Sequence, residues 1–177
     1  MCKRFSFVEN YVIYLLVKLP IIHCGLLQYT FHIIRGIFYL KYGKGHNSTN
    51  YSKWIGNNTK ASYPIKYEYG YEPYVIGAKK HIPRFYDFFR GYGINKVSWV
   101  TEIHLAGYKF EVLRDYYIFH AKHTSSYNST DKRRQLKQNT FCSKRFMNEV
   151  VNRYGGYADL DHHVLWRWKE HTLKLMK

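Results

Sequence analysis

Aromatic side chains constrain the fold of this chain more than any other feature. Tyr occurs 19 times, Phe 11 times and Trp 4 times, so that aromatic residues make up 19% of the 177 residues. Such rings remove a large apolar area from water, but each buried tyrosine hydroxyl needs a hydrogen-bond partner. Apolar residues reach 46% in total, which excludes a disordered polyelectrolyte in spite of a net charge of +16. The length suits one domain, or half of a larger one.

The positive charge favours an anionic partner. Lys and Arg number 28 against 12 Asp and Glu, and a field of this sign attracts nucleic acids, phospholipid headgroups, nucleotide-sugar diphosphates and uronic-acid glycans alike. The basic residues are spread along the chain, with short clusters at 79–80 and 132–134, and they form no zinc-finger, basic-zipper or RNP pattern. Each cluster is therefore interpreted as a solvated face, and nucleic-acid binding is the least favoured function. The three cysteines cannot all pair with one another, and they leave the compartment open.

Residues 1–42 form an apolar amino-terminal segment with two interpretations. Between 11 and 40 the apolar run is interrupted by charged residues, histidines and Pro20, so it contains no clean span of about 18 apolar residues. Lys3 and Arg4 followed by the apolar stretch 11–17 are typical of a signal anchor. The alternative is a pair of buried helical or strand segments broken at Pro20. The segment is predicted to be a membrane anchor or a non-native start.

Four asparagines lie in N-glycosylation acceptor triplets without a central proline, namely Asn47, Asn50, Asn57 and Asn128. They favour exposure to a lumenal compartment. A chain rich in Asn, Ser and Thr also forms such triplets by chance, so they do not establish the localisation alone.

The remaining sequence alternates between turn-forming and periodic segments. Asn95 can cap a helix whose apolar positions Val97, Val100 and Ile103 are followed by a left-handed Gly107. Alternation over 108–112 predicts a half-buried strand. The other predicted elements are a long loop at 43–61, a strand at 71–76, a helical turn at 82–89, a strand at 116–119, a loop at 124–131, and helices carrying apolar stripes over 146–154 and 160–175.

Several segments, taken in order, resemble the carboxy-terminal part of family 49 glycosyltransferases, which include the LARGE-type glucuronyltransferase domain and beta-1,4-glucuronyltransferase. The similarity covers about residues 39 to 155. The matched positions are Lys44-Gly-His46, Thr49-Asn-Tyr51, Trp54, Tyr71-Glu-Pro-Tyr-Val75, Pro83, Tyr86-Asp87, Phe89, Gly91-Tyr-Gly-Ile-Asn-Lys96, Glu102, Gly107-Tyr-Lys-Phe-Glu-Val-Leu113, His120, Asn139 and Arg153-Tyr-Gly155.

The resemblance implies an α/β protein, the carboxy-terminal portion of a GT-A type fold with an incomplete mixed sheet and flanking helices. Residues 43–155 would then be the glycosyltransferase part, and 156–177 a carboxy-terminal helix. The implied activity is inverting transfer of glucuronate, with Mn²⁺, from UDP-glucuronate to a xylose-containing O-mannosyl glycan on a glycoprotein, at the lumenal side of the Golgi membrane. A non-catalytic basic module that binds acidic glycans is the alternative.

Candidate site residues follow from the resemblance and from the chemistry of such a transfer, which needs a base for the acceptor hydroxyl and a metal for the departing diphosphate. His120 is the expected metal ligand, and its alternative is a hydrogen-bonded histidine at a strand end. Glu102 is the candidate base, with a structural salt bridge as its alternative. The expected substrate-binding residues are Glu72, Tyr92, Asn95 and Lys96. Neither Asn95 nor Lys96 can be a carboxylate base, but both can donate hydrogen bonds to sugar hydroxyls or a uronate.

The Asp-x-Asp motif of such enzymes lies upstream in the family, in a half of the domain that this sequence does not contain. The letters Asp159-Leu-Asp161-His-His163 follow two glycines instead of an apolar strand. They are interpreted as a helix N-cap with an acidic first turn. We therefore expect a truncated chain that retains the acceptor side of the domain.

Overall fold

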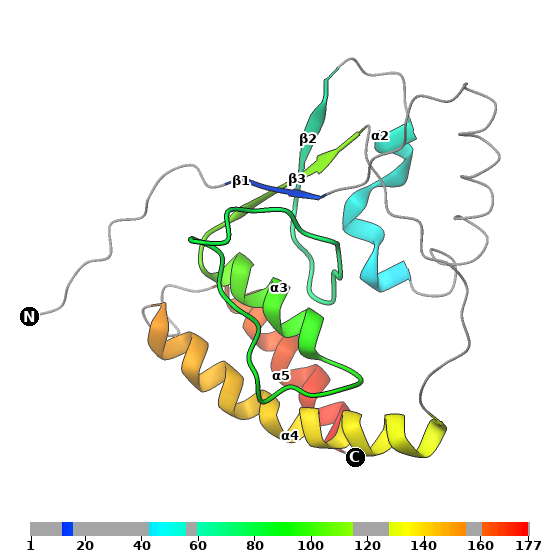
Figure 1. The fold of residues 1–177 in the computed structure, drawn as a ribbon, viewed down its shortest axis with the longest axis vertical. Helices are drawn as coiled ribbons and strands as arrows, with labels where there is room; N and C mark the ends of the chain where they lie inside the picture. The colour runs from blue at the N-terminus through cyan, green and yellow to red at the C-terminus, as the bar shows by residue number, and fades with distance from the viewer. Residues whose placement is uncertain (1–11, 16–42, 56–59, 115–127, 155–160, 177) are drawn as a thin grey trace, which may run out of the picture.

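The computed structural model describes residues 12–15, 43–55, 60–114, 128–154 and 161–176 (Figure 1). These residues form a mixed α/β arrangement, as the sequence predicts. The elements, in chain order, are β1 (Val12–Leu15), the 3₁₀ helices η2 (Gly43–Gly45) and η3 (Asn47–Thr49), α2 (Tyr51–Ile55), β2 (Ser62–Ile65), α3 (Asn95–Leu105), β3 (Lys109–Leu113), α4 (Ser129–Arg153) and α5 (His162–Met176).

The sheet has three strands in the order β1-β3-β2. The central strand β3 runs parallel to β1, with Val12 opposite Lys109, and antiparallel to β2, with Ser62 opposite Leu113. Phe110 and Val112 are buried whereas Lys109 is exposed, so the predicted alternation of β3 is confirmed. Four residues of the apolar amino-terminal segment are thus a sheet strand, one of the two interpretations offered for it.

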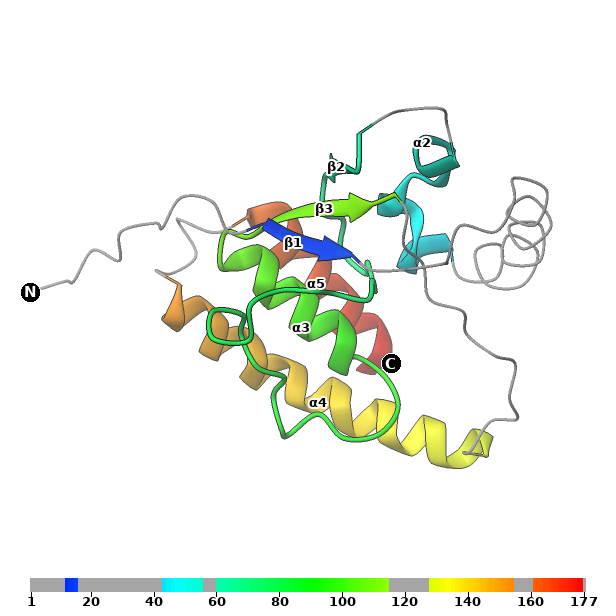
Figure 2. The same cartoon turned by 45° about the horizontal axis from the view of Figure 1, so that its top comes forward.

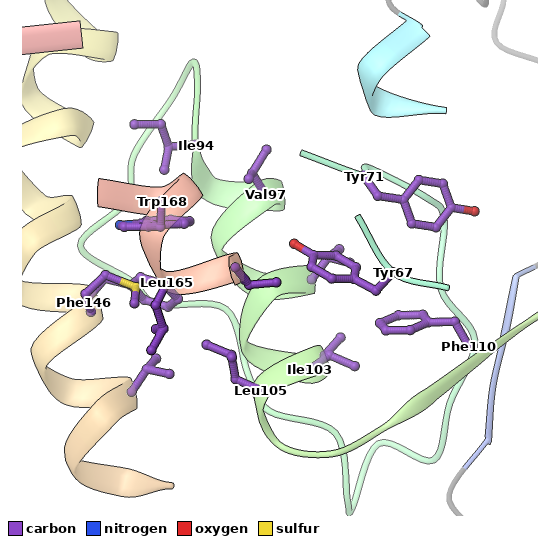
Figure 3. Close-up of a cluster of buried hydrophobic side chains, with 14 of the residues drawn as sticks. Tyr67, Tyr71, Ile94, Val97, Ile103, Leu105, Phe110, Phe146, Leu165 and Trp168 are labelled. Atoms are coloured by element: carbon purple, nitrogen blue, oxygen red, sulfur yellow. The ribbon is translucent and has the colours of Figure 1, made fainter. Parts of the chain in front are cut away.

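Helices α3, α4 and α5 lie on one side of this sheet, and α3 lies between the sheet and α4 (Figures 1 and 2). Figure 3 shows Tyr67 and Phe110 on the sheet side of α3, with Phe146 of α4 and Trp168 of α5 on the other side. The rings of Tyr67 and Phe110 stack with centroids 5.8 Å apart, and those of Phe146 and Trp168 lie 4.8 Å apart. Because α3 contacts both layers, it is the central element of the core.

Helix α3 confirms the predicted apolar positions, since Val97, Val100 and Ile103 are buried and Gly107 has a φ of 87°. The predicted N-cap is wrong. Ile94 occupies the cap position with no side-chain cap hydrogen bond, and Asn95 is the first helical residue. The Asn95 side chain instead accepts from the backbone N–H of Lys96 at 2.8 Å, so it does not reach the next turn as a capping oxygen would.

Some other predicted elements differ from the structure. The predicted loop at 43–61 contains η2, η3 and α2. Strand β2 was missed because it contains Pro64, which an edge strand tolerates since half of its backbone groups need no ladder partner. The segment 71–76 is not a strand: only Ile76 forms an isolated β-bridge, and the backbone N–H of Glu72 bonds to Gly45 O at 3.0 Å. The segment 82–89 forms turns and no helix.

The two carboxy-terminal helices agree better with the sequence. Phe146 and Val150 of α4, and Val164 and Trp168 of α5, are buried as their stripes predict. Helix α4 begins earlier than expected, at Ser129, within the predicted loop at 124–131. Asp161 accepts from the N–H of Val164 at 3.2 Å, which confirms the predicted N-cap of α5, although the first turn of that helix contains no acidic residue.

The predicted strand at 116–119 and His120 lie outside the described residues, as do Asn57 and Asp159. Among the described residues, no helix has the length and hydropathy needed to cross a bilayer.

Candidate functional site

The glycine turn at 91–93 is shaped by its contact with α4. Gly91 and Gly93 have φ values of 70° and 91°, which disfavour residues with a side chain. A Cβ at Gly91 would lie 2.3 Å from Gln135 Oε1, and a Cβ at Gly93 would lie 2.7 Å from Leu136 Cδ1. The positive φ values therefore favour glycine at both positions, and a side chain there would also require Gln135 or Leu136 to move.

Asn139 of α4 is the residue that holds this turn. Its side chain is 1% exposed and is fully engaged with turn backbone. The Oδ1 atom accepts from Arg90 N at 3.1 Å, and Nδ2 donates to the carbonyl oxygens of Arg90, Tyr92 and Gly93 at 3.0, 3.0 and 2.9 Å. One helical turn earlier, Gln135 Oε1 accepts from Tyr92 N at 2.6 Å. The buried amide thus fixes the backbone that leads into Asn95 and Lys96.

Lys96 meets the segment that carries Glu72. Its Nζ lies 4.1 Å from the centroid of the Tyr74 ring, a cation–π contact. Burial lowers the pKa of the Lys96 ammonium, and the nearby Glu72 carboxylate opposes this shift. Two of the predicted substrate-binding residues, Glu72 and Lys96, are therefore brought together from positions 24 residues apart in the sequence.

A third matched segment, Lys44-Gly-His46, lies next to the segment that carries Glu72. The hydrogen bond from Glu72 N to Gly45 O ties it to the segment of Glu72. Burial, and secondarily the charge of Lys96, lowers the pKa of His46, so its neutral imidazole is favoured. We call His46, Glu72, Tyr74 and Lys96 the Lys96 cluster. It offers an ammonium, a carboxylate, a neutral imidazole and a half-exposed ring, groups that suit a sugar with hydroxyl or carboxylate substituents.

Tyr92 lies on the glycine turn, and Asn95 follows that turn as the first residue of α3, next to Lys96 in the sequence. Asn95 Nδ2 donates back to Gly91 O at 3.4 Å. The Tyr92 ring is 48% exposed and has Lys132 Nζ 5.5 Å from its centroid. Their roles in substrate binding stay predictions.

Glu102 lies in a different environment. Its side chain is 0% exposed, and Oε1 accepts from Arg153 Nη1 at 2.6 Å and from Tyr154 Oη at 3.1 Å. Burial raises the pKa of this carboxyl, and Arg153 opposes the shift. Both hydrogen-bond donors come from the end of α4, and neither belongs to the Lys96 cluster. This geometry favours the structural salt bridge over the catalytic base, and the catalytic role stays a prediction.

The metal implied by the resemblance needs carboxylate and imidazole ligands. Within the ranges that the structure covers, no group of three or more His, Cys, Asp or Glu side chains is placed to hold a metal ion. His120, the predicted ligand, lies outside those ranges, so no step of a reaction is assigned to a metal.

Three of the predicted glycosylation sites are exposed. Asn47, Asn50 and Asn128 lie at the surface. Asn128 Oδ1 accepts from Asp131 N at 2.7 Å as the cap of α4, which leaves its Nδ2 available. The structure therefore presents these three asparagines where a modifying enzyme could reach them.

Sequence reasoning missed three residues of this region: His46, Tyr74 and Asn139. Each lies within a segment that carries the family resemblance. Their contacts could not be predicted from the sequence, since they depend on how η2 meets the segment of Glu72 and how α4 packs on the glycine turn.

Comparisons with known proteins agree with that resemblance. A family profile described as glycosyl-transferase for dystroglycan matches residues 26–155. The chain is 35% identical over 122 residues to Xylosyl- and glucuronyltransferase LARGE1 of Gallus gallus, covering 67% of this chain and 16% of that protein. It is 35% identical over 116 residues to the Homo sapiens protein of the same name, covering 63% of this chain and 15% of that protein. It is 29% identical over 114 residues to Beta-1,4-glucuronyltransferase 1 of Mus musculus, covering 62% of this chain and 27% of that protein. The chain thus spans less than a third of the length of each relative.

Proposed function

The chain belongs to the family of glycosyltransferases for dystroglycan, and from this premise we propose that it is the acceptor-side part of a glycosyltransferase. The reaction is the transfer of glucuronate, from UDP-glucuronate, to a xylose-containing O-mannosyl glycan of a glycoprotein. The names of the similar proteins, which are xylosyl- and glucuronyltransferases, support this class of sugar. A GT-A type fold and an inverting mechanism are part of the proposal.

One observation carries the proposal: three segments that share the family's pattern meet in the Lys96 cluster. The contact between Lys96 and the Tyr74 ring joins two of them, and the hydrogen bond from Glu72 N to Gly45 O joins the third. A partly buried ammonium is a selective partner for a sugar carboxylate, because burial strengthens the charge–charge interaction. Glu72 can accept hydrogen bonds from the hydroxyls of a neutral sugar such as xylose.

The cluster supplies binding and orientation and, through His46, a group that can take up a proton. A neutral imidazole accepts a hydroxyl proton when it lies within hydrogen-bond reach of the acceptor. We propose Mn²⁺ as the metal, with His120 as one of its ligands; it would neutralise the diphosphate of the leaving nucleotide. The proposed location is the lumenal side of the Golgi membrane, which the exposed Asn47, Asn50 and Asn128 support.

Because the proposed chain is the acceptor-side part of the domain, the test is a transfer assay with the full chain supplemented by the donor-binding half of the domain from a relative that contains it. It uses radiolabelled UDP-glucuronate or UDP-xylose as donor, a β-xyloside or β-glucuronide as acceptor, and Mn²⁺ or a chelator. We expect glucuronate on the xyloside, with transfer abolished by the chelator. Lys96→Gln should reduce transfer at least tenfold, since it removes a charged contact. Lys109→Gln, an equal change of charge at an exposed position of β3, should leave it unchanged.

The alternative, a basic module that binds acidic glycans without turnover, gives a different pattern. It predicts no transfer with either donor, together with affinity for glucuronides that depends on Lys96 and falls steeply with salt. Transfer that is equal in Lys96→Gln and Lys109→Gln would refute the role of the cluster.

A further inference from the structure

Exposed aromatic rings paired with a lysine occur at both ends of the segment 92–96. At one end, Lys96 Nζ lies over the ring of Tyr74, which is 48% exposed. At the other end, Lys132 Nζ lies 5.5 Å from the centroid of Tyr92, which is equally exposed at 48%. The first pair belongs to the Lys96 cluster; in the second pair, Tyr92 is one of the expected substrate-binding residues, whereas Lys132 has been given no role.

The second pair is held in place by the fold. Tyr92 comes from the glycine turn, and its backbone is bonded on both sides, with the N–H to Gln135 and the carbonyl to Asn139. Lys132 precedes Gln135 by three residues on α4, so the two side chains lie on the same face of the helix. The hydrogen bonds order the backbone but leave the ring half in water. A ring presented in this way is available to a ligand at little further entropic cost.

We propose that Tyr92 and Lys132 form a second subsite, which binds an anionic pyranose unit next to the Lys96 cluster. The C–H groups on the apolar face of a pyranose pack against the aromatic ring, whose face carries partial negative charge. The ammonium of Lys132, held close to that ring, pairs with the carboxylate of the same sugar. The inference rests on the proposed function, and it extends the bound ligand from one sugar to an oligosaccharide.

The spacing of the two pairs fits one ligand. Tyr92 and Lys96 are separated by four residues, which span at most about 14 Å in an extended chain and less in a turn. An oligosaccharide of a few units is long enough to span this separation. Simultaneous contact raises affinity by making the second interaction intramolecular.

The experiment compares a one-sugar ligand with a longer one, by isothermal titration of the full chain. The probes are methyl β-glucuronide and a tetrasaccharide that contains glucuronate. We expect Tyr92→Ala and Lys132→Gln each to weaken tetrasaccharide binding about fivefold, a typical effect for a partly exposed cation or ring contact. The methyl glucuronide should bind Lys132→Gln like the wild type, and it should lose affinity in Lys96→Gln.

The matched control is Lys137→Gln, which removes an equal charge from an exposed position of α4. It should change tetrasaccharide affinity less than twofold. Tyr92→Phe keeps the ring and should retain binding, which separates the ring contact from damage to the turn. Circular dichroism spectra and melting temperatures of all variants identify any that fail to fold.

Unchanged tetrasaccharide affinity in folded Tyr92→Ala and Lys132→Gln would overturn the subsite while leaving the Lys96 cluster in place. An equal loss in Lys137→Gln would also overturn it, since the effect would then be one of net charge. If the wild type binds neither acidic probe, the subsite is refuted, and the proposed transfer is decided separately by its own assay.

Discussion

Replacing Arg153 by Met tests the interpretation of Glu102 as a structural ion pair. Glu102 is fully buried on α3, and only its Oε1 atom has hydrogen-bond partners among the described residues, Arg153 and Tyr154. The Oε2 atom is buried without a partner in that part of the structure. Removing the guanidinium therefore leaves a carboxylate inside the protein with a single neutral donor.

The exposed fractions of the Glu102 and Arg153 side chains determine how much stability Arg153→Met should lose. Loss of one partner of a fully buried pair costs about 3–5 kcal/mol. Arg153 is 50% exposed, so water screens part of its interaction, and we expect about 2–3 kcal/mol. For a protein of this length the melting temperature should fall by about 4–12 °C. Glu102→Gln, which removes the buried charge itself, should cost about 1 kcal/mol or less, and the double variant should resemble it.

The loss of stability in Arg153→Met should also depend on pH, and the raised pKa of Glu102 determines the direction of this dependence. Burial raises the pKa of this carboxyl above its ordinary value of 4.5. Between 4.5 and the raised value, the folded protein binds more protons than the unfolded chain, so stability falls as pH rises. Arg153→Met removes an interaction that opposes the upward shift, and its pH dependence should be steeper than that of the wild type. At acid pH the variant should approach the wild-type stability.

The assay is urea unfolding followed by tryptophan fluorescence between pH 4.5 and 8. Arg134→Met is the control, because it breaks an exposed pair with Asp131 on the same helix and should change stability by less than about 0.5 kcal/mol. An Arg153→Met loss no larger than that of Arg134→Met would refute the buried pair. So would a loss that persists unchanged in the Glu102→Gln background.

Further predictions concern the turn and the pH response. Asn139→Leu should destabilise the fold by about 1–3 kcal/mol, because the turn loses its buried partner; urea unfolding measures the loss. Gly93→Ala should destabilise more than Gly70→Ala in the same assay, since both have φ near 90° but only Gly93 has an atom, of Leu136, in the way of a Cβ. Burial lowers the pKa of His171 from 6.5, so the unfolded chain binds the proton more readily and stability should fall as pH decreases below 6.5. This slope should be reduced in unfolding curves of His171→Gln, because His46, whose pKa is lowered in the same direction, supplies the remainder; an unchanged slope would exclude His171 as a source.

Periodic segments were the predictable part of the fold. Helix α3 and strand β3 follow from apolar spacing, and Asp161 follows from its place ahead of an apolar stripe. Strand β2 could not be predicted, because Pro64 argues against a strand unless its edge position is known. The N-cap at Asn95 failed because the glycine turn places Ile94 there instead.

The candidate site, like the fold, could be predicted from the sequence only in part. Glu72 and Lys96 were predicted from a resemblance, and the structure places them together. Glu102 matched the same pattern, yet it is buried against Arg153. A residue pattern does not distinguish a carboxylate that faces a ligand from one that faces the core, because burial is set by long-range packing. Asn139 is 43 residues beyond Lys96 in the sequence, and only the packing of α4 on the turn reveals its role.

Saturation-transfer-difference NMR with methyl β-xyloside and methyl β-glucuronide tests the central claim, that the three matched segments form a sugar-binding site. We predict saturation of the sugar ring protons by the wild type and by Lys109→Gln. The glucuronide signal should be lost in Lys96→Gln, and the xyloside signal should be lost in Glu72→Gln. Signals of equal strength in all four proteins would contradict the assignment of the site.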